Sequence, residues 1–145
     1  MAFVTVFLTA LLISPPVLYW LGLSGAQGLP AKPVLLASKE QQLLVWRKAR
    51  GIGSPKVHAM NPYSVVIGLL SPSANRTDPG ELVAWWVASG YLLEHQRHRG
   101  MIWWHLSGTA LTIWLSRNWS CEELLSAAAL PDSSARSNAS FNGTT

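Results

Sequence analysis

Residues 78–100 read DPGELVAWWVASGYLLEHQRHRG, and residues 101–119 continue as MIWWHLSGTALTIWLSRNW. Together they hold six of the eight tryptophans of this 145-residue chain, in two apolar runs that a polar segment, Glu94–Gly100, separates. A helix that is apolar on every side is typically buried or lies in lipid. This stretch therefore predicts two apolar helices that meet at a polar, cationic corner.

The first of these helices begins with a recognisable cap. Asp78 has the spacing of an N-cap residue, with Pro79 at N1 and Glu81 at N3 of a capping box. Glycine just after the last helical residue is a frequent stop signal. We therefore predict a helix from Pro79 to Arg99 that stops at Gly100.

The second run carries a polar stripe. Its members lie at i, i+4, i+7 and i+11, and they are His105, Thr109, Thr112 and Ser116. At 100° per residue they fall within about 60° of arc. Their hydroxyls can bond back to carbonyls of the same helix, or the stripe can pack as a polar seam against another helix. Both interpretations stay open from the sequence.

Two further capping boxes, Ser38–Gln41 and Ser120–Glu123, mark helix starts on either side of this region. The first predicts a helix from Lys39 to about Arg50, with basic residues at its C-terminus. The second predicts a short helix that ends before Pro131. The predicted fold class is therefore mainly α.

The N-terminal segment Ala2–Leu23 contains 22 residues and no charge. At 1.5 Å per residue it is long enough to cross a hydrocarbon layer of about 30 Å, which predicts a transmembrane or signal-anchor helix. Pro15 and Pro16 interrupt the apolar run, and Ser24 and Ala26 are small residues at a candidate cleavage site. A cleaved signal peptide is therefore the alternative.

These patterns divide the chain into four parts. Residues 1–24 form the membrane anchor or signal peptide, and residues 25–37 form a linker rich in glycine and proline. Residues 38–130 form a small helical domain. Residues 131–145 are rich in serine and asparagine, and we predict that they form a disordered tail.

Composition points to a membrane environment. Only 12% of the residues are charged, against about 25% in typical soluble proteins. The formal net charge is +4, and basic clusters at 47–56 and 97–99 favour anionic partners such as lipid headgroups. No nucleic-acid-binding motif is present, so we expect membrane lipids and membrane proteins as partners. Cys121 is the only cysteine, which excludes an intramolecular disulfide, and we expect no metal or cofactor.

The corner and the stripe hold the candidate site residues. Glu94 and His98 are four residues apart, one turn of a helix, and could act as a general acid/base pair in a dry site. The neighbouring arginines disfavour a metal site and favour lipid headgroups. Paired tryptophans suit a membrane interface or stack on a sugar. The predicted lipid- or glycan-binding residues are Arg97, Arg99, Trp103, Trp104, His105, Thr109 and Thr112.

Several segments resemble motifs of the family 51 peptidoglycan glycosyltransferase domain. They are Glu81–Ser89, His98-Arg99-Gly100, Ser107–Thr112 with Arg117-Asn118, and Trp119–Leu125. In that family a helix ending AVVASED precedes H-x-G, a G-[GA]-S-T-[IL]-[ST] stretch follows, and a later helix reads S-K-x-E-I-L. The resemblance covers about residues 79–130. It implies a helical domain behind a membrane anchor that binds lipid-linked glycan at the outer face of the bacterial inner membrane.

The chain departs from this family at the catalytic positions. Counting back from His98, the position of the family's catalytic glutamate is Tyr91, and that of the next aspartate is Leu92. The family's Gln-Gln pair is Ile113-Trp114 here. We therefore expect a non-catalytic accessory protein or a subunit of an envelope complex of the secretion or conjugation type. A minimal peptidoglycan glycosyltransferase that uses Glu94 is the alternative.

Two observations bear on localisation. Lys32 and Lys39 follow the anchor and favour a cytoplasmic body, whereas the family resemblance implies an extracytoplasmic one. We expect a single-pass protein of the inner (plasma) membrane with an extracytoplasmic body. A secretory eukaryotic or viral membrane glycoprotein is a further alternative, because four asparagines begin N-x-[ST] sequons, namely Asn75, Asn118, Asn138 and Asn142.

Overall fold

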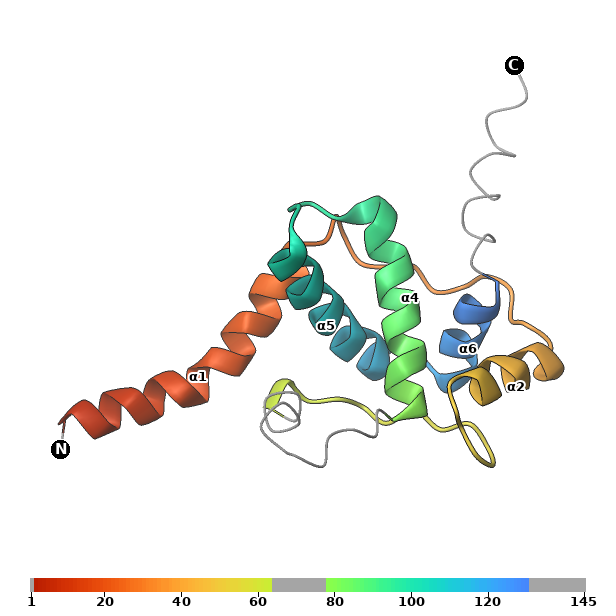
Figure 1. The fold of residues 1–145 in the computed structure, drawn as a ribbon, viewed down its shortest axis with the longest axis horizontal. Helices are drawn as coiled ribbons and strands as arrows, with labels where there is room; N and C mark the ends of the chain where they lie inside the picture. The colour runs from red at the N-terminus through yellow and green to blue at the C-terminus, as the bar shows by residue number, and fades with distance from the viewer. Residues whose placement is uncertain (1, 64–77, 131–145) are drawn as a thin grey trace, which may run out of the picture.

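The computed structural model describes the backbone of residues 2–63 and 78–130, and the side chains of 12–63 and 78–130. Within these ranges the predicted mainly helical fold is confirmed (Figure 1). The described ranges contain no extended strand, only one isolated antiparallel bridge. The predicted tail, 131–145, lies outside them. The helices are α1 (Ala2–Ser24), α2 (Lys39–Lys48), α4 (Pro79–His95), α5 (Met101–Asn118) and α6 (Cys121–Ala129).

Two of the three predicted capping boxes are formed. The Ser38 hydroxyl accepts a hydrogen bond from the Gln41 N–H at 3.3 Å, and the Gln41 side chain accepts from the Ser38 N–H at 3.1 Å. Ser120 and Glu123 make the same reciprocal pair at the start of α6, at 3.2 and 2.6 Å. Each box satisfies amides that the helix itself leaves unpaired. The starts of α2 and α6 are thus encoded locally.

The predicted third box is wrong in its geometry, although its helix begins where expected. Asp78 is the N-cap, but its carboxylate accepts from the Gly80 N–H at 2.8 Å. Glu81 does not reach back to the Asp78 amide in the described structure. The Glu81 side chain therefore takes no part in capping α4.

The predicted end of the same helix is also wrong, because α4 stops at His95 instead of Arg99. Gln96 is extended and forms an antiparallel bridge with Ala26. The Gln27 N–H donates to the His95 carbonyl at 2.7 Å, and the Arg97 N–H donates to the Gly25 carbonyl at 2.9 Å. Residues 25–27 thus pair with residues 95–97, where the last helical turn was predicted. We call this pairing, which joins the end of α1 to the α4–α5 corner, the clip.

The N-terminal helix, α1, continues through Pro15 and Pro16, where the sequence predicts an interruption. It changes direction along its length and projects from the body (Figure 1), as helices with internal prolines commonly do. Its C-terminal part packs on α5. Among the described parts of the chain, no helix is both long and apolar enough to cross a membrane. The anchor role of residues 1–24 stays a prediction.

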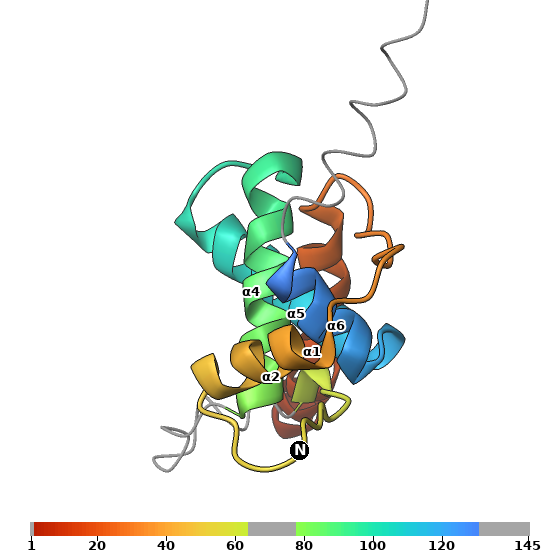
Figure 2. The same cartoon turned by 90° about the vertical axis from the view of Figure 1, so that its right-hand side faces the viewer.

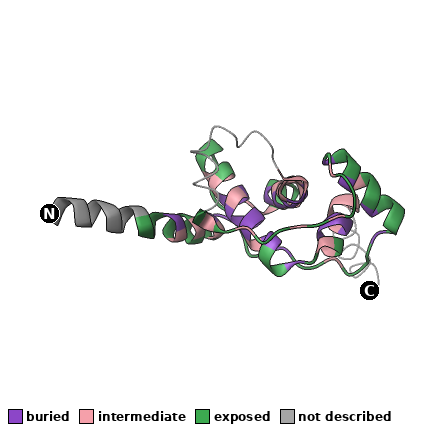
Figure 3. Cartoon of the chain, turned by 90° about the horizontal axis from the view of Figure 1, so that it is seen from below, coloured by how far each residue is buried: buried purple, intermediate pink, exposed green. Residues whose placement is uncertain are grey.

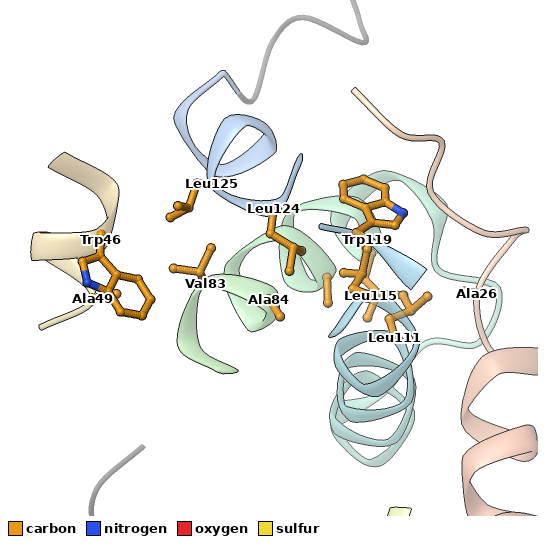
Figure 4. Close-up of a cluster of buried hydrophobic side chains, with 12 residues drawn as sticks. Ala26, Trp46, Ala49, Val83, Ala84, Leu111, Leu115, Trp119, Leu124 and Leu125 are labelled. Carbon is orange, nitrogen blue, oxygen red and sulfur yellow. The ribbon is translucent and has the colours of Figure 1, made fainter. Parts of the chain in front are cut away.

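The hydrophobic core lies where α2, α4, α5 and α6 meet (Figure 4). Trp46 of α2 and Trp119, just after α5, lie at opposite ends of this cluster, and both are buried. Leucine side chains of α6 and small residues of α4 fill the space between them. Seen from the side in Figure 2, α2 and α6 lie together over α4 and α5.

The predicted linker, 25–37, is held at both ends. Its first residues form the clip with the α4–α5 corner. At its far end the Ala37 N–H donates to the buried Ser126 hydroxyl at 2.9 Å, and Lys32 forms an ion pair with Glu123 at 3.0 Å. Most of its side chains are nonetheless exposed, as are those described for α1 (Figure 3).

Candidate functional site

A pocket of about 270 Å³ opens between α4 and α5. The first turns of α4, the middle of α5 and the segment that follows α2 contribute its walls. The residues that line it are Met60, Glu81, Leu82, Trp85, Thr109 and Thr112. Two of them, Thr109 and Thr112, belong to the predicted site, whereas Glu81 and Trp85 do not.

Glu81 is the charged group of this pocket. Asp78 caps the Gly80 amide, and the Glu81 side chain lines the pocket and is half-buried. Burial raises its pKa above the ordinary value of 4.5, and the nearby Asp78 charge raises it further. Within the described structure no hydrogen bond or ion pair satisfies this carboxyl. The pocket therefore presents an unpaired acidic group.

Trp85 is held in place by α5. A Cβ atom at Gly108 would lie 2.7 Å from the Trp85 ring, so only glycine allows the indole to approach α5 this closely. The indole also stacks on the His105 imidazole, with ring centroids 6.3 Å apart and an angle of 12° between planes. The absence of a side chain at Gly108 thus fixes one wall of the pocket.

The residues of the polar stripe on α5 have different roles. Thr112 donates to the Gly108 carbonyl and Ser116 to the Ile113 carbonyl, both at 2.8 Å, which confirms for these two the prediction that hydroxyls bond back to their own helix. Ser116 also accepts from the Met60 N–H at 3.0 Å and so fixes the loop beside the pocket. Thr109 lines the pocket, and His105 is exposed.

The predicted acid/base pair is not on one helix, because α4 ends at His95. Glu94 is exposed and lies outside the pocket. The His98 ring packs on Trp103, with centroids 4.5 Å apart. The helical-turn relation on which the pair depended is therefore wrong, and any catalytic role of Glu94 and His98 stays a prediction.

Other residues give the corner its structure, and sequence reasoning missed them. The Tyr91 ring stacks on His95 at 4.2 Å, and the Tyr91 hydroxyl donates to the Gln27 carbonyl at 3.0 Å. Burial raises the pKa of the Tyr91 phenol. Tyr91 stands where the resemblance places a catalytic glutamate, and here it ties α4 to the clip. A sequence offers no signal for this bond, because its two partners are 64 residues apart.

The surface of the corner combines charge with exposed apolar groups. Arg97 and Arg99 are exposed, and so are three large apolar side chains around them, Leu93, Met101 and Ile102. Trp103 and Trp104 are half-buried, and Trp104 packs against the core. The predicted lipid-binding residues are thus divided between this surface and the pocket on α5.

Metal-ligating side chains and the sequon asparagines are the remaining candidate sites. Within the described ranges, no three His, Cys, Asp or Glu side chains come together as a metal site would require. Asn118 is exposed and donates to the Trp114 carbonyl at 2.7 Å. The other three sequons, at Asn75, Asn138 and Asn142, lie outside the described residues.

Comparisons with known proteins give no match for this chain, whether the search is made against protein-family models, curated proteins or solved structures. The resemblance to the family 51 glycosyltransferase domain stays a prediction.

Proposed function

We propose that this protein is a membrane-anchored, non-catalytic subunit of a bacterial cell-envelope complex, of the secretion or conjugation type. The observation that carries the proposal is the uncovered apolar surface of α1, which continues into the cationic α4–α5 corner. Membrane lipids and apolar faces of partner proteins are the surroundings that would cover such a surface.

The exposed apolar side chains of α1 occupy several sides of the helix. Trp20 is 68% exposed, Leu12 63% and Val17 54%. Each apolar Å² left in water costs roughly 25 cal/mol, so a lipid or protein environment that covers this helix would stabilise the protein considerably. The full set of large exposed apolar residues described on α1 is Leu12, Ile13, Val17, Leu18, Trp20 and Leu21.

The corner would lie at the headgroup level of such a membrane. The clip between Ala26 and Gln96 places the corner beside the C-terminal end of α1. Arg97 and Arg99 can then meet anionic headgroups, an attraction of about 1 kcal/mol for each basic residue. Exposed Met101 and Leu93 can insert beside them.

A second uncovered surface supports a role as a subunit. Leu44 of α2 is 63% exposed, and the linker leaves Val34, Leu35 and Leu36 in solvent. The helix α2 itself lies on the side of the body away from the projecting α1 (Figure 1). We propose that it contacts a membrane protein partner.

The geometry supports catalysis less well. A general base works best in a site that excludes water, with a hydrogen-bond partner that holds it. Glu94 is exposed and lies outside the pocket. A Glu94→Gln variant tests the alternative of a minimal peptidoglycan glycosyltransferase: we expect unchanged function in cells, and loss of function would favour the enzyme.

The membrane proposal is tested by extraction of the full-length protein from bacterial membranes with alkaline carbonate. We expect the native protein to stay in the membrane pellet. A Leu18→Glu/Leu21→Glu double variant should move to the supernatant, since each charge inside the hydrocarbon layer costs roughly 2.5–3.5 kcal/mol. Ile52→Glu is the control, because Ile52 is an exposed apolar residue of the segment that follows α2. Retention of the double variant would contradict the proposal.

A further inference from the structure

We infer that the pocket between α4 and α5 binds a small organic ammonium ion, with the Glu81 carboxylate as its counter-ion and Trp85 as its aromatic wall. This inference does not depend on membrane attachment, because the pocket involves the first turns of α4 and the middle of α5, whereas the corner lies where α4 ends and α5 begins.

The negative charge of the pocket lining favours a cationic ligand. Glu81 is its only ionisable residue, and Asp78, the next acidic group, lies close enough to affect it electrostatically. Asp78 already caps Gly80 and contacts His58 at 3.3 Å, whereas Glu81 has no hydrogen-bond or ion-pair partner in the described structure. An anionic ligand would be repelled by both carboxylates. A cation would supply the missing partner of Glu81.

The remaining walls select an organic cation over a metal ion. Hard divalent cations require six or more oxygen ligands in most sites, and this lining offers one carboxylate and the hydroxyls of Thr109 and Thr112. Trp85, Leu82 and Met60 provide apolar and polarizable surface, which suits the methyl or methylene groups of an alkylated ammonium ion.

The volume of the pocket further restricts the class of ligand. At about 270 Å³ the pocket is slightly smaller than the roughly 300–1,000 Å³ of sites for drug-sized ligands. A neutral sugar would need several hydrogen-bond partners around its ring, and the lining has few. A choline-like or methylated amine group fits better, whether it comes from a free metabolite or from a lipid headgroup.

The test is a titration of the full-length protein with choline chloride, in a detergent with a sugar headgroup so that no other ammonium group is present. Binding is followed by NMR at the indole N–H of Trp85, which a Trp85→Phe variant assigns. We expect a saturable shift that sodium chloride at the same ionic strength does not produce. Absence of a saturable shift would overturn the inference.

Variants make the role of the carboxylate specific. Glu81→Gln keeps the shape but removes the charge, and we expect choline affinity to fall by roughly ten- to a hundredfold, the range for a lost bond to a charged group. Glu81→Asp should recover part of the affinity. Glu94→Gln, which removes an exposed carboxylate outside the pocket, should bind choline like the native protein. Equal choline affinity in Glu81→Gln would overturn the inference.

One further measurement distinguishes a free amine from a lipid headgroup as the ligand. Another distinguishes the pocket proposal from the membrane proposal. Binding of choline without phosphocholine would indicate a free amine, and binding of both would indicate a lipid headgroup. Glu81→Gln should stay in the membrane pellet after carbonate extraction, so failure of the pocket proposal and failure of the membrane proposal give different results.

Discussion

At the scale of single residues, Gly22 sets the distance between α1 and α5. A Cβ atom at this position would lie 2.6 Å from both the Ala110 side chain and the Leu106 carbonyl oxygen. Backbone atoms of a packed helix cannot move aside as a flexible side chain can. The docking of α1 on the body therefore depends on the absence of one methyl group.

We predict that Gly22→Ala destabilises the docked state of α1 by about 1–3 kcal/mol, the usual cost of overpacking. The measurement is urea unfolding in detergent, followed by tryptophan fluorescence. Gly90→Ala is the matched control, since Gly90 is a helical glycine of α4 with no atom within 4 Å of its would-be Cβ. The control should gain about 0.5–1 kcal/mol from helix propensity. Similar stability changes in the two variants would contradict this account of the interface.

Glu81 gives a prediction for pH dependence. Its pKa is raised in the folded protein, so between the ordinary and the raised value the folded state holds more protons than the unfolded state. Stability contributed at this site is therefore lost as the pH rises through that window. We predict that Glu81→Gln is more stable than the native protein at pH 7 by a few tenths of a kcal/mol, since solvent screens a half-exposed group.

The measurement is thermal unfolding of both proteins across the pH range. The difference in melting temperature should shrink as the pH falls below the ordinary carboxyl pKa, because the native Glu81 is then protonated in both states. A Glu81→Gln variant that is less stable at neutral pH would show that the carboxylate has a stabilising partner.

The same residue shows why the sequence could not reveal the pocket. Asp78, Pro79 and Glu81 match a capping box, which assigns the glutamate to the helix end. In the structure Asp78 selects the Gly80 amide, one residue earlier, and the glutamate turns to the pocket. Both arrangements are compatible with the same four residues, so the local sequence cannot distinguish between them.

At the scale of elements, helix starts were predictable and helix packing was not. The boxes at Ser38 and Ser120 lie within four consecutive residues each, so local sequence contains all their partners. The end of α4 depends instead on Ala26, whose bridge to Gln96 has no local signature. The predicted division into anchor, linker and domain likewise missed the hydrogen bonds that fix the linker to the corner and to α6.

The junction of the linker, α2 and α6 is organised by one buried hydroxyl. Ser126 accepts from the Ala37 N–H at 2.9 Å, and the Gln42 amide lies 3.4 Å from the same oxygen. All three residues are buried. Loss of this oxygen would leave a buried N–H without a partner, which is more costly than loss of an exposed bond.

We therefore predict that Ser126→Ala costs about 1–3 kcal/mol of unfolding free energy, measured by urea titration. Ser89→Ala is the control, because the Ser89 hydroxyl donates only to the Trp85 and Trp86 carbonyls of its own helix. The control should change stability by less than about 1 kcal/mol. Equal losses in the two variants would refute the role of Ser126 as a junction.

At the scale of the whole molecule, the protein consists of a helical body and the helix α1, which projects from it (Figure 1). Within the described residues the body has its own core, whereas α1 contacts mainly α5. The proposed orientation places the body outside the cytoplasm. We predict that alkaline phosphatase fused after Thr145 is active in a bacterial host and that a green fluorescent protein fused there is dark. The reverse result would place the body in the cytoplasm and exclude contact with lipid-linked glycan at the outer face of the membrane.

The clip also affects how the protein is made. Gln27 and Gln96 are 69 residues apart, and a ribosome adding roughly 5–20 residues per second needs on the order of several seconds to cover that distance. An isolated helix forms within about a microsecond. For those seconds α1 exists before α5 has been synthesised. In the proposed membrane-bound protein, α1 would therefore meet the bilayer before it could pack against α5.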